Sequence, residues 1–177
     1  MNLEQEAPHR PNDKEVIVWP WIGIIVNIQR DFKDGKYIGL ANWELKDRFS
    51  GFNLTQVCAM WTYEGHQGKA VLEFNKDWQG YSDSLSFERS FIKNHRSIEE
   101  YYEREQVPRN NLYGWVAQSE NYNSGGPVGK HLRSKGDLNT VAQIITEDLC
   151  KKNIWIGLHG LITTILEALL ENLFALK

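Results

Sequence analysis

The chain has 177 residues, which is enough for one domain with its own hydrophobic core and too few for two full domains. Its 20 Lys and Arg residues against 23 Asp and Glu residues give a formal net charge of -3, so binding to nucleic acid requires a local basic surface. Two cysteines, Cys58 and Cys150, lie far apart in the sequence. They exclude a disulfide framework or a zinc knuckle within the chain and favour a reducing intracellular setting.

The beginning of the chain predicts a leader followed by a buried strand. Residues 1–15 lack the apolar run of a signal peptide and predict a disordered leader. Residues 16–28 (VIVWPWIGIIVNI) are apolar and rich in β-branched residues, which is typical of a central strand buried on both faces. Pro20 has no N–H to donate, so we expect it to separate a lead-in piece around Trp19 from the strand proper.

A turn and a helix are predicted next. Residues 30–37 (RDFKDGKY) predict a charged loop that turns at Asp34 and Gly35, and this turn could also be the tip of a hairpin. Residues 39–52 predict a helix with Asn42 as its N-cap. Spacings of four and three place its apolar residues on one face, namely Leu45, Phe49 and Phe52.

Two strands follow. Residues 55–63 (TQVCAMWTY) predict a strand with Val57, Ala59 and Trp61 on one face and Cys58, Met60 and Thr62 on the other. In residues 65–78 (GHQGKAVLEFNKDW), Gly65 and Gly68 predict a turn into a second strand. The strand has the two-residue period of one face that meets a core, with Ala70, Leu72 and Phe74 alternating with Lys69, Val71 and Glu73.

The second half of the domain is predicted to contain a long helix, a strand and a basic loop. Asp77 or Asn75 can cap a helix over residues 78–94 whose apolar stripe contains Tyr81, Leu85 and Ile92, with Phe87 and Phe91 beside it. Residues 97–109 are acidic and are expected to face away from any binding surface or to pair locally, and any helix there ends at Pro108. Residues 112–118 predict the fourth strand.

Residues 121–136 are predicted to form a loop, because they contain four glycines and a proline. The only charged residues in this loop are Lys130, Arg133 and Lys135, so it is the clearest basic surface segment of the chain.

The predicted order, β-α-β-β-α-β, defines an α/β (α+β) fold with a ferredoxin-like sheet like that of RNA-recognition-motif domains. Residues 67–74 (QGKAVLEF) align with the longer signature motif of those domains, with Gly68, Ala70, Leu72 and Phe74 matching. Lys69 and Val71 stand where the base-stacking aromatic residues would be, and Ile24 occupies the stacking position of the shorter motif. The scaffold is therefore predicted without its usual stacking residues.

Four motifs resemble a known family. They are WPW at residues 19–21, GHxGxAVxEFxxDWxGY at 65–81, YGWVA at 113–117 and GxHLRxxGDLxTV at 129–141. Together they resemble the XS domain of plant gene-silencing proteins over residues 16–141. The factor of DNA methylation group is closer than the suppressor of gene silencing group.

The resemblance implies an RNA-recognition-like domain that binds double-stranded RNA with a 5′ overhang in RNA-directed DNA methylation. It also implies action in the nucleus, with the cytoplasm as a second location, alongside silencing proteins of the same family, with no catalytic residues and no cofactor. The alternative is a non-catalytic protein-protein assembly module of a silencing complex that does not bind RNA directly.

Eight residues are candidates for RNA contact. Trp19 and Trp21 could stack on unpaired bases or pack in the core. His66 could touch phosphate or close its turn with a hydrogen bond. Lys69 could contact the RNA backbone or pair with Glu73. The remaining four form either a clamp for RNA or a solvated loop, and they are Lys130, His131, Arg133 and Lys135.

No enzymatic site is predicted. The five histidines form no metal-spaced pair with a carboxylate, neither cysteine lies in a nucleophile motif, and no glycine-rich phosphate loop opens a helix. We therefore expect neither a metal nor a cofactor.

Residues 142–177 form a separate C-terminal segment that is apolar from residue 154 onward and unlike the heptads expected of the family. We expect a helix that folds back or makes a homo- or heterodimer. A membrane anchor is disfavoured by four polar interruptions, His159, Glu167, Glu171 and Asn172. A truncated end with no selected role is the third alternative.

Overall fold

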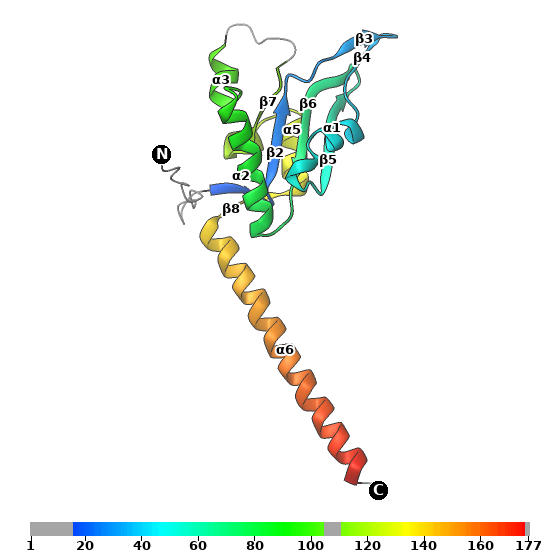
Figure 1. Ribbon diagram of the computed structural model, residues 1–177, viewed down its shortest axis with the longest axis vertical. Helices are drawn as coiled ribbons and strands as arrows, with labels where there is room; N and C mark the ends of the chain where they lie inside the picture. The colour runs from blue at the N-terminus through cyan, green and yellow to red at the C-terminus, as the bar shows by residue number, and fades with distance from the viewer. Residues whose placement is uncertain (1–15, 105–110, 176–177) are drawn as a thin grey trace, which may run out of the picture. The chain divides into compact units, whose positions relative to one another are not determined.

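The computed structural model describes residues 16–104 and 111–175, and the side-chain surroundings of residues up to 169. The predicted leader and Pro108 lie outside these residues. The chain divides into two compact units, one containing Val16–Asn139 and the other containing the described part of Thr140–Lys177. Figure 1 shows the elements of each.

The first unit is built on an antiparallel sheet in the order β5-β6-β2-β7. The strands are β2 (Ile22–Val26), β5 (Gln56–Thr62), β6 (Gly65–Glu73) and β7 (Tyr113–Val116). Helix α1 (Asn42–Arg48) connects β2 with β5, and α2 (Trp78–Lys93) connects β6 with β7. The predicted β-α-β-β-α-β order and the α/β class are confirmed.

Two further strand pairs extend this scaffold. As predicted, Pro20 interrupts the first apolar run, which leaves β1 (Val16–Trp19) to pair with β8 (Asp137–Thr140) in a separate two-stranded sheet. The hairpin alternative for residues 30–37 is confirmed, with β3 (Asp31–Lys33) and β4 (Lys36–Ile38) joined at Asp34 and Gly35. Both turn residues have positive φ, 51° and 79°, as the two-residue hairpin turn requires.

The back face of the sheet is covered by α1 and α2. Their apolar side chains form one core with the inward residues of the strands, and its members include Leu45, Phe49, Val57, Ala70, Leu72, Phe74, Phe87 and Phe91. Asp77 is the N-cap of α2, since its Oδ1 accepts from the Gly80 N–H at 2.7 Å. Ile92, predicted on the apolar stripe, is exposed instead.

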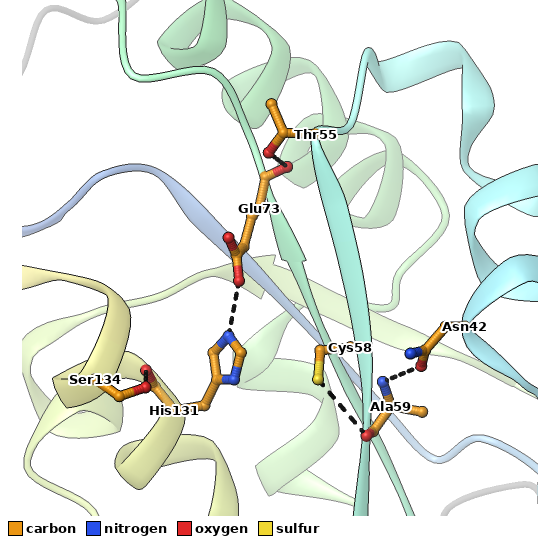
Figure 2. Close-up of polar contacts among 7 residues, drawn as sticks. All are labelled: Asn42, Thr55, Cys58, Ala59, Glu73, His131 and Ser134. Atoms are coloured by element: carbon orange, nitrogen blue, oxygen red, sulfur yellow. Dashed lines mark hydrogen bonds and ion pairs between the residues drawn. The ribbon is translucent and has the colours of Figure 1, made fainter.

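Two residue predictions on this face are wrong. Asn42 is not the N-cap of α1 but its first residue, and its Oδ1 accepts from the Ala59 N–H at 2.7 Å, which ties α1 to β5 (Figure 2). Trp61 does not share the core with Val57 and Ala59. A register shift between Ala59 and Trp61 turns its ring outward, where it is 51% exposed.

The front face of the sheet is also covered, because the predicted basic loop is helical. Residues 119–135 form α4 (Ser119–Tyr122) and α5 (Pro127–Lys135), and a short α3 (Ile98–Glu103) precedes β7. Pro127 suits the first turn of a helix, and Val128 and Leu132 lie one turn apart and pack on the sheet. The second core contains Ile24, Val26, Met60, Val71, Tyr113, Trp115 and Leu132.

The glycines that predicted a loop here permit close packing of helices instead. A Cβ on Gly129 would lie 2.1 Å from the Ser124 carbonyl oxygen, so only glycine lets α5 approach the end of α4.

The second unit is one long helix, α6 (Val141–Ala175). It begins well before the apolar stretch that predicted it. Val141 and Ile144 in its first turn are buried, but its large apolar side chains from Leu149 to residue 169 are exposed, including Ile154, Trp155, Ile156, Leu158, Leu161, Ile162, Ile165 and Leu166. Within the described residues, no helix combines the length and the apolarity that crossing a bilayer requires.

Candidate RNA-binding surface

Helix α5 turns one side toward the sheet and the other toward solvent. Leu132 is fully buried and Val128 is half-buried, whereas Lys130, Arg133 and Lys135 are exposed. Because inward and outward residues share a nine-residue helix, packing on the sheet fixes where the three cations lie. The basic segment is therefore a structured surface rather than a solvated loop.

Lys69 of β6 lies next to this helix. It is exposed and lines a cavity of about 200 Å³ together with Gln67, Met60 and the beginning of α5 at Gly126, Pro127 and Val128. The ion pair between Lys69 and Glu73, one of the two alternatives for Lys69, does not form. The Glu73 carboxylate contacts His131 instead. We name Lys69, Lys130 and Lys135 the lysine group, because each is exposed and none has a hydrogen bond or ion pair within the described residues.

His131 is the residue that fastens α5 to the sheet. Its Nε2 lies 3.0 Å from Glu73 Oε1, and the two side chains are only 13% and 17% exposed (Figure 2). This contact joins β6 to α5 across the front of the sheet. His131 therefore acts in the structure as a clip between β6 and α5.

Cys58 lies in the same region. Burial raises the pKa of the Cys58 thiol, the Glu73 carboxylate raises it further, and the Lys135 ammonium lowers it. A thiol with a raised pKa stays protonated at neutral pH and is a poor nucleophile.

Arg133 is engaged by the backbone. Its Nη1 donates to the Tyr122 carbonyl oxygen and, at 2.9 Å, to the Ser124 carbonyl oxygen. These are carbonyl groups at the end of α4 that the helix itself leaves without partners. Arg133 therefore holds the turn between α4 and α5, in addition to its exposed position beside the lysine group.

The structure does not expose the two tryptophans for stacking on bases. Trp21 is 2% exposed, and its Nε1 donates to the Asp77 carbonyl oxygen at 3.2 Å. Its ring lies edge-on to Trp19 at 5.2 Å and 4.6 Å from the ring of Tyr81. Trp19 is half-buried against the same core. The core-packing alternative describes both residues.

His66 is also internal. It is fully buried, its Nδ1 accepts from the Gly68 N–H at 2.9 Å, and the ring of Trp61 covers it at 5.0 Å. Burial lowers the pKa of His66, the Leu40 carbonyl raises it and Arg30 lowers it. The predicted turn at Gly65 and Gly68 is wrong, because both residues belong to β6 and the tight turn lies at Tyr63 and Glu64. The His66–Gly68 hydrogen bond is therefore a local bond within the strand and does not close a turn.

Of the eight candidates, the structure brings together Lys69 and the four residues of α5, and it buries or half-buries the other three. A larger cavity of about 510 Å³ lies beside α1 and contains none of the candidates. Its lining mixes charges, with Asp31, Glu44 and Arg48. Among residues 16–104 and 111–175, no group of three or more His, Cys, Asp or Glu side chains is placed to hold a metal ion.

The prediction missed a set of exposed aromatic residues on the β3–β4 hairpin, Phe32 and Tyr37, with Arg30 beside them. The signal was present in the alternation of aromatic and basic residues in RDFKDGKY.

These features define a class of protein, an α/β domain with a ferredoxin-like sheet whose front is closed by a basic helix. The chain belongs to the XS domain family, whose profile matches residues 14–124. It is 36% identical over 143 residues to Protein INVOLVED IN DE NOVO 2 and 32% identical over 143 residues to Factor of DNA methylation 1, both of Arabidopsis thaliana. It is 29% identical over 132 residues to the Protein SUPPRESSOR OF GENE SILENCING 3 homolog of Zea mays.

The matched regions cover 79%, 81% and 71% of this chain, respectively, but only 22%, 22% and 21% of the three relatives. The chain therefore spans about a fifth of the length of the relatives it matches.

Proposed function

We propose that this chain is an RNA-binding domain of small-RNA gene silencing that binds double-stranded RNA with a 5′ overhang in RNA-directed DNA methylation. Membership of the XS domain family supports this proposal, as do the names of the relatives, which refer to DNA methylation and gene silencing. The domain acts in the nucleus, with the cytoplasm as a second location, and its protein partners are silencing proteins of the same family.

The lysine group is the observation that carries the proposal. Three exposed ammonium groups without partners in the described residues are available to neutralise phosphates. Duplex RNA is recognised mainly by its shape, phosphates and 2′-hydroxyls, which requires no aromatic residues on the sheet. A basic helix over the front of the sheet is therefore compatible with duplex binding.

Two acidic side chains near α5, Glu73 and Asp137, have hydrogen-bond partners. Glu73 bonds to His131, and Asp137 Oδ1 accepts from the Tyr122 hydroxyl at 3.3 Å. On α3, Glu100 accepts from the Ser97 N–H at 2.6 Å and Glu99 accepts from the Ser97 hydroxyl at 2.7 Å, so two of the acidic residues in that stretch pair locally as predicted.

The proposal is tested with lysine variants in an electrophoretic shift assay on an RNA duplex with a 5′ overhang and on a blunt duplex. Each of Lys69→Ala, Lys130→Ala and Lys135→Ala should weaken binding and reduce the slope of log affinity against log salt by about one. Lys93→Ala, which removes an exposed lysine at the end of α2 on the back of the sheet, is the matched control and should change little. Unchanged affinity and salt slope in the triple variant would refute the RNA proposal.

A second candidate function is a protein-protein assembly module. The covered front of the sheet favours it, because the surface on which RNA-recognition domains stack bases is occupied by α4 and α5. Protein binding would be indifferent to the three lysine substitutions, and the chain would shift neither duplex. Co-purification of family proteins by the wild type and the triple variant alike would support this second function.

A further inference from the structure

The β3–β4 hairpin presents two aromatic rings to solvent. Phe32 is 68% exposed and Tyr37 is 37% exposed, and their ring centroids are 5.2 Å apart in an edge-on arrangement. The strand register places Phe32 directly opposite Tyr37, so both rings lie on the same face of the hairpin. Large exposed rings in a soluble domain indicate a contact surface when they are grouped.

A guanidinium group is fixed on this face. The Arg30 side chain lies over the Tyr37 ring, with Cζ 4.6 Å from the ring centroid, and its Nη1 donates to the His66 carbonyl oxygen at 3.2 Å. On the other side it lies against Gly68, where an added Cβ would be 3.2 Å from Arg30 Nε. The cation is therefore held between the ring and the backbone of β6 rather than moving freely in solvent.

The hairpin places its rings and most of its charged residues on different faces. Asp31 lies opposite Ile38 and Lys33 lies opposite Lys36, and both pairs alternate with the Phe32–Tyr37 pair. Side chains of successive strand residues point to opposite faces, so Asp31, Lys33 and Lys36 are on the face away from the rings, and Arg30 is the cation on the ring face. At the adjacent turn, the Glu64 carboxylate accepts from the Tyr63 hydroxyl at 3.0 Å. The ring face thus combines aromatic surface with positive charge, which matches an anionic, aromatic ligand.

We propose that Arg30, Phe32 and Tyr37, which we name the hairpin platform, stack the unpaired bases of the bound RNA. This inference rests on the proposed function and adds the place that receives the unpaired nucleotides. Aromatic rings and arginine planes bind every base through its π face, so the platform recognises single-stranded character and not sequence. The phosphates of the same nucleotides lie near Arg30. A protein ligand is disfavoured, because the one aliphatic residue of the two strands, Ile38, is on the other face.

The test uses the full chain and RNA duplexes that carry the fluorescent base 2-aminopurine either in a 5′ overhang or within the paired region. With wild-type protein, stacking should quench the overhang probe and leave the paired probe unchanged. The Phe32→Ala/Tyr37→Ala variant should lose the quenching and bind the overhang duplex about fivefold or more weakly, since one stacked base contributes at least that factor. Its affinity for the blunt duplex should equal that of the wild type.

Two further variants separate stacking from simple apolar contact and from unfolding. Phe32→Tyr/Tyr37→Phe keeps both rings and should behave as the wild type. Phe32→Leu/Tyr37→Leu keeps apolar volume without π faces and should fail as the alanine variant does. Tyr102→Ala removes a 70% exposed ring on α3, on the other side of the same unit from the hairpin, and should change neither affinity (Figure 1). Unchanged circular dichroism and melting temperature show that each variant is folded.

The outcomes distinguish the two proposals. If the alanine variant binds and quenches as the wild type does, the platform is refuted while the proposed function stands. If overhang and blunt duplexes are weakened equally, or if the leucine variant keeps the quenching, stacking at this site is also refuted. If the wild type binds neither duplex, the proposed function itself fails, and the platform fails with it.

Discussion

His131 and Glu73 are the residues on which the attachment of α5 to the sheet depends most directly. Glu73→Gln keeps the shape of the side chain but removes its charge, and His131→Ala leaves the carboxylate without its partner in a largely buried position. We expect each to lower the free energy of unfolding by about 1–3 kcal/mol, as for other buried hydrogen bonds that involve a charged group. Urea denaturation measures this loss.

The matched control for that prediction is the exposed pair of His95 and Glu100, which has a similar separation of 3.1 Å. Solvent screens this pair, so His95→Ala should change stability little. If the losses of stability from the His131 and Glu73 substitutions simply added in the double variant, as they do for two distant residues, the clip between β6 and α5 would be refuted.

His66 makes the stability of the domain dependent on pH. Its pKa is lowered in the folded chain, mainly by burial, so between the folded and unfolded pKa values the unfolded state binds more protons. Stability should therefore be greatest above the ordinary histidine pKa of about 6.5, fall as the pH decreases through it, and level off below the folded pKa. Urea midpoints of wild type and His66→Gln, measured from about pH 8 to about pH 5 across the ordinary histidine pKa, give the difference in stability. The two curves should converge at low pH, and parallel curves would contradict the prediction.

At the scale of the elements, the contact between α4 and α5 depends on Gly129. An alanine there would place its Cβ 2.1 Å from the Ser124 carbonyl oxygen, which belongs to the backbone and cannot turn aside. We expect Gly129→Ala to lower stability by about 1–3 kcal/mol, the cost of overpacking, although alanine is the better helix former. Thermal unfolding with Gly125→Ala as control tests this, since a Cβ at Gly125 meets nothing within 4 Å. Equal effects of the two substitutions would argue against the close approach.

The elements that the sequence predicts well are those whose apolar residues repeat with a clear period. Strands β5 and β6 and the helices α1 and α2 were predicted in this way, because each has one face that meets the back core. Helix α5 was missed, because its beginning contains Gly126, Pro127 and Gly129. Glycine and proline are typical of a loop, but they also occur in a helix that starts at proline and packs through glycine. That a helix covers the front of the sheet follows from tertiary packing and not from local pattern.

The same distinction applies to the candidate site. Lys130, Arg133 and Lys135 of the predicted basic segment are exposed, because charged side chains are mostly found at the surface and are visible in the sequence. The burial of Trp21 and His66 is not visible in the sequence, since a tryptophan or a glycine-flanked histidine can lie in the core or at the surface. The hairpin platform depends on a strand register, which a three-residue strand does not specify by itself.

For the whole molecule, α6 predicts self-association. Ile154, Trp155, Leu158 and Leu161 are all exposed and, at about 100° per residue, lie on one broad face of the helix. We expect the chain to form dimers or larger assemblies in sedimentation velocity. Leu161→Glu/Ile165→Glu should shift it toward the monomer. Thr163→Glu/Thr164→Glu adds the same two charges at exposed polar positions and should shift it less. A wild-type chain that stays monomeric at all concentrations would contradict this expectation.

The pairing of β1 with β8 has a practical consequence for experiments on this domain. The first and last strands of the Val16–Asn139 unit lie side by side, and Figure 1 places them at the opposite end of the unit from β3 and β4. A short linker could join the two ends and give a circular permutant reopened between Gly125 and Gly126, where both positions have open space. Dyes or tethers attached at either end of the Val16–Asn139 unit would extend from the same edge of that unit. Immobilising the protein at this edge therefore keeps the hairpin accessible to ligand.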